Sequence, residues 1–150
     1  MDALQTPPLT LCVSKATLAA SGAATTWSTT GATLYAIKGK AYTTSAASSA
    51  ASPTSDGVLG TTFASKPLAA NTGTVFVWCY DGSSTTAATA IKVVQGSVES
   101  LDVSGNFLKA PDFANIPDAL CPFAYSIVRN GSTGSNWTFG TSNWNATGIT

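Results

Sequence analysis

The chain contains no histidine. Histidine is the most common general base in enzymes and the most common metal ligand. Its absence therefore excludes Ser-His-Asp and Cys-His catalytic arrangements and most zinc sites. Charge is also scarce, because only 9% of the 150 residues are charged, against about 25% in an ordinary soluble domain. Low charge removes a defence against association, so this composition indicates a surface that is largely covered by partners.

The few charges are balanced, with seven basic and seven acidic residues scattered along the chain. A nucleic-acid-binding protein needs a basic stripe, so we expect no nucleic-acid partner. No apolar run approaches the length of a membrane span, so we expect no membrane partner. Residues 9–24, "LTLCVSKATLAASGAA", have the composition of a signal peptide. Asp2 precedes them and Lys15 interrupts them, so we expect no such signal.

The acidic residues show no catalytic pattern. Glu99 and Asp102 are three residues apart on an expected strand, which points them to opposite faces. Asp112 and Asp118 lie in an expected loop, where their spacing constrains nothing. No D-x-D-x-D calcium motif is present. We therefore predict a protein that is not an enzyme, with no catalytic residues, no metal site and no cofactor.

Three cysteines are present: Cys12, Cys79 and Cys121. Their odd number does not suit a fully paired disulfide framework, and their spacing does not suit a metal site. The sequence favours buried, reduced thiols in a protein assembled in a reducing cytosol. One disulfide with one free thiol is the alternative.

Strand signals dominate the chain. "TVFVWCY" (74–80) is apolar on both faces, which is typical of a central strand or of one beneath an interface. Other segments rich in β-branched and aromatic residues alternate with Gly, Asn and Pro turns. These expected strands lie within 33–44, 88–96, 97–111 and 123–131, and the last of them places Phe123, Tyr125 and Ile127 on one face. We expect one or two more strands around Trp137 and Trp144.

The remaining segments predict little helix. Residues 43–56 read as a long Ala/Ser/Thr loop, and 110–123 as a Pro-rich crossover with one helical turn at 118–121. The sequence thus predicts an all-β protein, a single domain over 1–150 built as a β-sandwich or barrel with long Ala/Ser/Thr- and Pro-rich loops. Residues 1–15 form either an extended arm that adds a strand to a neighbour or a free tail.

The segment "SNWTFGTSNWNATG" (135–148) is the candidate assembly or binding surface. Aromatic rings there can stack on sugars while amides bind hydroxyls. Uncharged rings can equally pack in the core or at a subunit contact, and we favour this second interpretation. The candidate residues are Trp137, Phe139, Trp144, Asn136 and Asn143. Asn-X-Ser/Thr sequons occur at 130, 136 and 145, but glycosylation needs a secretory route, which we do not expect, and we interpret Asn130 and Asn145 as turn residues.

Three stretches within residues 27–148 stand out: "WSTTGATLYAIKGKAYTT", "TVFVWCYDG…KVVQGSV" and the run from "SVESLDVSGNFLKAPDFANIPDALCPFAYSIVRNGST" into "WTFGTSNWNATG". Their general pattern resembles small structural proteins of tailed bacteriophages. The resemblance implies a virion component, either a capsid decoration (cement) protein, a head fibre or a tail protein, without catalytic residues.

From the resemblance and the composition together, we expect a capsid decoration protein that clamps adjacent subunits of the major capsid protein. Other virion proteins are the alternative partners, and we expect self-association as a trimer. The chain would be assembled in the host bacterial cytoplasm and reside in the virion. The alternative is a receptor- or glycan-binding module of a tail or head fibre that uses the C-terminal Trp/Asn segment.

Overall fold

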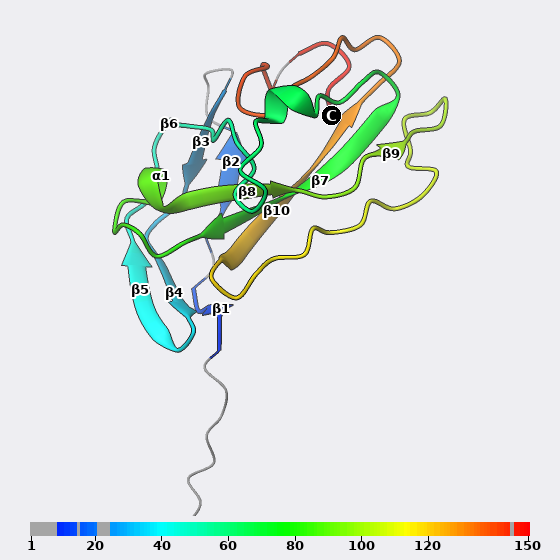
Figure 1. The fold of residues 1–150 in the computed structure, drawn as a ribbon. Coiled ribbons are helices and arrows are strands. Elements are labelled where there is room, and N and C mark those ends of the chain that lie inside the picture. The colour runs from blue at the N-terminus through cyan, green and yellow to red at the C-terminus, as the bar shows by residue number, and fades with distance from the viewer. Residues whose placement is uncertain (1–8, 15, 21–24, 145) are drawn as a thin grey trace, which may run out of the picture.

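The computed structural model describes residues 9–14, 16–20, 25–144 and 146–150. The regular secondary structure of these residues is almost entirely β, with three antiparallel sheets that contribute to one main core (Figure 1). This confirms the all-β class that the alternating apolar pattern predicts. Among the described residues the helical elements are short: the 3-10 helix η1 (Phe63–Ser65) and the helix α1 (Ala87–Ala90).

The central sheet is built around β7 (Thr72–Tyr80). It pairs with β10 (Cys121–Asn130) on one side and with β8 (Ile91–Gln95) on the other, and β9 (Glu99–Ser100) pairs with its first residues. Phe76, Trp78 and Tyr80 enter the main aromatic core, whereas Val77 and Cys79 enter a smaller core on the opposite face. The two-sided apolar pattern of 74–80 is therefore that of a central strand, as expected.

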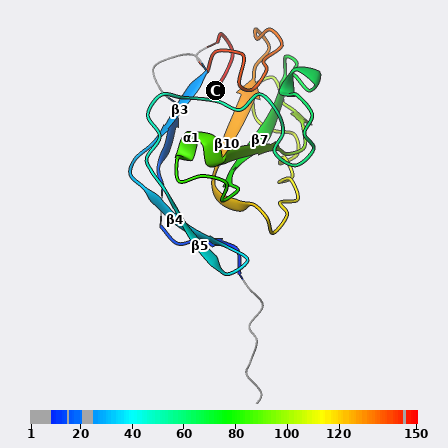
Figure 2. The same ribbon diagram turned by 60° about the vertical axis from the view of Figure 1, so that its left-hand side comes forward.

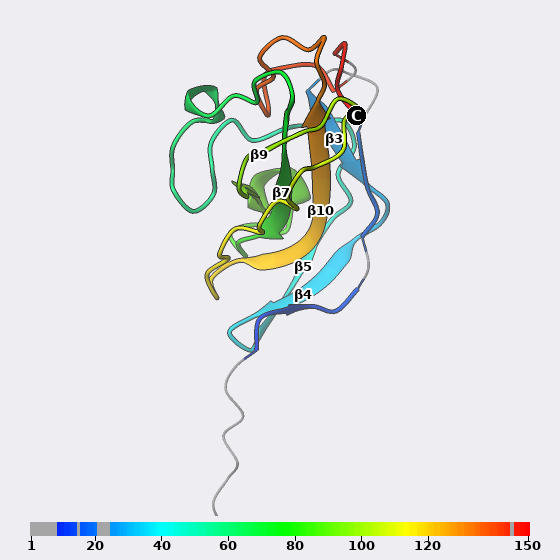
Figure 3. The same ribbon diagram turned by 90° about the vertical axis from the view of Figure 1, so that its right-hand side faces the viewer.

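Two three-stranded sheets contribute to the aromatic core. One has the order β1 (Leu11–Cys12), β4 (Thr33–Ile37), β5 (Lys40–Thr44), and the other β2 (Leu18–Ala20), β3 (Thr26–Thr29), β6 (Ala50–Ala51). Tyr35 stacks on Tyr80 with ring centroids 5.1 Å apart, and Trp27 lies 5.5 Å from Trp78. Figure 2 shows the β4–β5 hairpin at one end of the molecule, within the range 33–44 where the sequence predicts strands. Figure 3 shows β4 near β10, and these two strands are in contact.

The C-terminal segment closes the core without forming the strands expected there. Around Trp137 and Trp144 the described chain makes only isolated bridges, Leu68 to Trp137 and Asn130 to Ile149. A turn at Gly140, where φ is +72°, breaks the segment. A Cβ at this position would lie 2.2 Å from the carbonyl oxygen of Pro53. Close approach of two loops therefore replaces strand pairing.

Other sequence expectations need correction. The helical turn expected at 118–121 is wrong, because a turn at 118–120 leads directly into β10. The return strand expected at 88–96 starts only at Ile91, because α1 occupies the residues before it. The loop expected at 43–56 contains the end of β5 and all of β6.

The expected common face of Phe123, Tyr125 and Ile127 is also wrong. The register of β10 shifts between Pro122 and Ala124. Phe123 therefore stacks on Tyr80, with centroids 4.3 Å apart, on the side of the main core. Tyr125 and Ile127 lie opposite Val77 and Val75 and are exposed on the outer face of the central sheet.

The N-terminal arm expected at 1–15 falls partly outside the described residues, which omit 1–8 and 15. The described part does not extend freely from the domain. Leu11 and Cys12 pair with Ala36 and Tyr35 of β4, and the N–H of Gly39 donates to the carbonyl of Leu9.

Candidate binding surfaces

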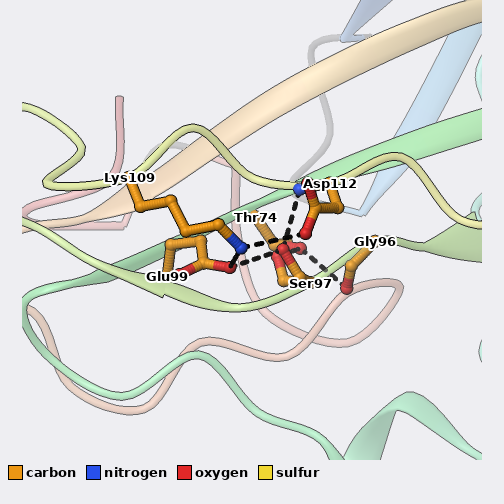
Figure 4. Close-up of polar contacts among 6 residues, drawn as sticks. All are labelled: Thr74, Gly96, Ser97, Glu99, Lys109 and Asp112. Carbon is orange, nitrogen blue, oxygen red and sulfur yellow. Dashed lines mark hydrogen bonds and ion pairs between the residues drawn. The ribbon is translucent and has the colours of Figure 1, made fainter.

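The carboxylates considered for catalysis are held in local structure. Ser97 Oγ donates to Glu99 Oε1 at 2.7 Å and accepts the N–H of Asp112 at 2.8 Å (Figure 4). Lys109 Nζ lies 3.4 Å from Glu99 Oε1 and 2.9 Å from Asp112 Oδ2. Thr74 Oγ1 donates to the carbonyl of Ser97 at 2.7 Å. This network fastens the crossover after β9 to the central sheet, and Glu99 and Asp112 share the single cation Lys109.

The carboxylate of Asp102 likewise accepts hydrogen bonds within a turn. Its Oδ1 accepts the N–H groups of Asn106 and Ser104, each at 2.8 Å, and these hydrogen bonds lower the pKa of the carboxyl. A carboxylate with a lowered pKa is a poor general acid near neutral pH. Within the described ranges, no three His, Cys, Asp or Glu side chains gather to hold a metal ion.

The cysteines form no disulfide, and two of them are fully buried. Cys79 lies in the smaller core and Cys121 in the main aromatic core, so the sheet separates them. Burial raises the pKa of each of these two thiols to about 12. A protonated, buried thiol is inert, because the thiolate is the nucleophile and the metal ligand. Cys12 is half-buried, and its Sγ donates to the carbonyl of Ser14.

The five candidate residues of the C-terminal segment do not form one surface. Trp137 and Phe139 are each only 2% exposed and belong to the main core. Trp144 is half-buried and packs 5.2 Å from the ring of Trp137. Asn136 and Asn143 are exposed and line a hollow of about 350 Å³ together with the edge of Trp137. The segment thus contributes rings to the interior and amides to the exterior.

An apolar face is exposed on the outer side of the β1–β4–β5 sheet. Leu11 lies opposite Ala36, so the odd-numbered residues along β1 and the even-numbered residues of β4 share the outer side. The side chains of Leu9, Leu11, Val13 and Leu34 are all exposed there, with fractions from 41% to 61%. We call these four residues the N-terminal apolar face. A contiguous exposed apolar patch of this kind marks an interaction surface.

A second apolar surface covers the outer face of β10. Tyr125 and Ile127 are exposed there, and the exposed ring of Phe113 packs edge-on against Tyr125 at 5.5 Å. The crossover before β10 carries Phe113 and leaves a shallow hollow of about 320 Å³ beside these rings.

The third surface is a cleft of about 320 Å³ between β2 and β10. Leu18, Ala19 and Ala20 form one wall, residues 125–128 the other, and Trp27, Trp78 and Trp144 also line it. None of the described side chains that line this cleft is charged. Sequence reasoning missed the cleft, because residues 16–24 carried no recognised strand signal. The alternation of small Ala124 and Ser126 with Tyr125 and Ile127 was the available clue.

Comparison with protein-family models, with curated proteins and with solved structures finds no match to this chain. In the part of the chain that the structure describes, no helix has the length and apolar character needed to cross a membrane. The described residues therefore form an all-β fold with an exposed N-terminal apolar face, an apolar outer face of β10 and an uncharged cleft between β2 and β10.

Proposed function

We propose that this chain is a non-enzymatic structural protein of a tailed-phage virion, and that it acts as a capsid decoration protein. It would bind across adjacent subunits of the major capsid protein, as a trimer, and stabilise the shell through added contact area. The resemblance of residues 27–148 supports the phage context. The scarcity of charge supports a surface that is covered by partners.

One structural observation carries this proposal: the N-terminal apolar face. Leu9 and Val13 are 61% and 58% exposed on the same sheet face as Leu11 and Leu34. Covering such half-exposed side chains contributes about 1 kcal/mol each, since full burial of a large apolar side chain contributes about 1.5–3 kcal/mol. A contact of this size is weak alone. Repetition around a symmetric shell turns it into stable binding.

The test is binding to intact particles. The protein should copurify with intact particles at a copy number near that of the major capsid protein. The Leu9→Glu, Val13→Glu double variant should lose this binding while keeping its melting temperature, because both side chains are exposed. A matched control, Val103→Glu with Leu108→Glu, adds the same charges at exposed apolar positions elsewhere and should still bind. A wild-type chain absent from particles, or a Leu9→Glu, Val13→Glu variant that binds normally, contradicts the proposal.

A glycan-binding module of a tail or head fibre is the second candidate. The hollow beside Asn136 and Asn143 favours it, because exposed amides can bind sugar hydroxyls. The buried ring of Trp137 offers no face for stacking, which makes this candidate the weaker one. A glycan array tests it. Binding that disappears in the Asn136→Ala, Asn143→Ala variant would favour the glycan-binding role over decoration.

A further inference from the structure

The cleft between β2 and β10 lies between the outer strands of two sheets. β10 is the outer strand in the order β10–β7–β8, and β2 is the outer strand in the order β2–β3–β6. Such edges carry backbone N–H and C=O groups that no neighbouring strand pairs. Both edges line the cleft, beside Trp27 and Trp78.

The register identifies the unpaired groups on β10. In an antiparallel pair, successive residues direct their N–H and C=O groups alternately toward and away from the partner strand. Arg129 directs both groups away from β7, because they bond Thr150 at 2.9 and 3.1 Å. The ladder is regular from Ala124 to Asn130, so Tyr125 and Ile127 direct theirs to the same open edge. No hydrogen bond to these four groups is found within residues 9–14, 16–20, 25–144 and 146–150.

The same edge already accepts a strand-like segment. The N–H of Gly131 donates to the carbonyl of Gly148, Asn130 bridges Ile149 in antiparallel fashion, and Arg129 pairs with Thr150. Residues 148–150 therefore run antiparallel to β10, and Ile149 and Thr150 line the cleft. A strand that continued this line would meet Val128, Ile127, Ser126 and Tyr125 in turn.

We propose that the β2–β10 cleft is the acceptor site for an extended strand donated by a different protein of the assembly. The strand adds antiparallel to β10 in line with residues 148–150, and its backbone satisfies the open groups of Tyr125 and Ile127. This assignment rests on the proposed function only for the source of the strand.

The chemistry of the cleft defines the donor sequence. Side chains opposite Val128 and Ser126 point to the same side of the sheet as the ring of Trp78, whose Nε1 donates to Ser126 Oγ. No described side chain there carries a charge, and a buried unpaired charge is costly, so these donor positions are apolar and uncharged. Donor side chains opposite Ile127 and Tyr125 point to the outer face. The site thus selects an uncharged strand with apolar residues at alternate positions.

The experiment supplies such a strand in cis. The chain is extended after Thr150 by five residues that alternate valine and threonine, valine first, which places valines opposite Val128, Ser126 and Ala124 in the existing register. Amide hydrogen exchange of Tyr125 and Ile127 should slow at least tenfold, and the melting temperature should rise. One control extension carries aspartate at the first and third added positions. The other carries proline at the second and fourth, which removes the N–H donors. Neither control should protect these amides.

Unchanged exchange at Tyr125 and Ile127 in the valine–threonine form, with the Arg129 amide still protected, would overturn the acceptor site. Equal protection by the aspartate extension would overturn it as well, because the cleft would then not select uncharged strands.

Particle binding then tests the source of the strand. The valine–threonine extension fills the cleft of its own chain, so it should weaken particle binding at least tenfold, whereas the aspartate extension should not. Two results would count against a strand donated by the particle. One is undiminished particle binding by the valine–threonine form, and the other is an equal loss of particle binding with both extensions. Neither result contradicts the decoration role. A chain that binds particles in no form contradicts the decoration role, while hydrogen exchange still decides the acceptor site. If the unextended chain forms oligomers and the valine–threonine extension dissociates them, the donor strand comes from a second copy, and a donor from another protein is refuted.

Discussion

Replacing Trp137 by alanine tests whether the C-terminal segment serves the core or a ligand. The indole is 2% exposed and lies against Phe76, Phe139 and Trp144, with centroids 6.1, 6.2 and 5.2 Å away. Its Nε1 donates to the carbonyl of Asn143 at 2.9 Å. Its backbone pairs with Leu68 through hydrogen bonds of 2.8 and 2.9 Å. The ring therefore helps to hold two loops against the end of the central sheet.

The expected loss is large. Truncation of a buried aromatic side chain to alanine costs about 3–5 kcal/mol. A domain of this size loses about 3 °C of melting temperature per kcal/mol, so Trp137→Ala should lower the melting temperature by about 12 °C. Trp137→Phe keeps much of the packing and loses the Nε1 hydrogen bond, so it should cost less than half as much. Trp144→Ala should also cost less, because Trp144 is only half-buried.

Thermal melts, sedimentation and a glycan array on these variants decide the question. A Trp137→Ala protein that melts and assembles like the wild type but has lost glycan binding would refute the core role of this residue. A large loss of stability with no glycan binding by the wild type supports packing.

Three further predictions follow from buried polar and ionisable groups. Burial raises the pKa of Cys79 from its ordinary value of 9.0 to about 12. The stability contributed by the neutral thiol is full below pH 9 and is lost as the pH rises toward 12, at about 1.4 kcal/mol per pH unit. Denaturant melts of wild type and Cys79→Ala should show a shallower alkaline decline in the variant, and parallel curves would contradict this. Maleimide should label Cys12 in the native protein well before Cys79 or Cys121, and mass spectrometry of digests would expose the opposite order. Asp56→Ala should cost about 3 kcal/mol by equilibrium unfolding, because this buried carboxylate accepts the N–H groups of Val58, Leu59 and Gln95; a loss below about 1 kcal/mol would show that water replaces it.

The fold class and the central strand were predictable because their signals are local. Residues 74–80 alternate large apolar side chains on both faces, and only a strand covered on both sides buries them all. The Gly39 turn between alternating segments likewise predicts the β4–β5 hairpin. The absence of histidine and the scattered carboxylates are properties of composition alone, and they predict a protein that is not an enzyme. For the central strand and the hairpin, neighbours along the chain carry the whole signal.

The surfaces depended on contacts between distant segments. The register shift after Pro122 turned Phe123 toward the core and left Tyr125 and Ile127 outside, which residue parity alone predicts wrongly. Among the C-terminal candidates, Trp137 is buried and Asn143 is exposed. This difference results from the close approach of two loops at Gly140 rather than from strand pairing.

The cleft is the clearest case of what only the tertiary structure decided. Its walls come from residues 18–20 and 125–128, more than a hundred positions apart, and each wall alone is an ordinary short strand. The sequence by itself determined that these segments are uncharged and that the domain is β. The packing of the sheets around the aromatic core decided that β2 and β10, each the outer strand of its sheet among the described residues, face one cleft. Long-range packing, and not local pattern, determines which strands become edges.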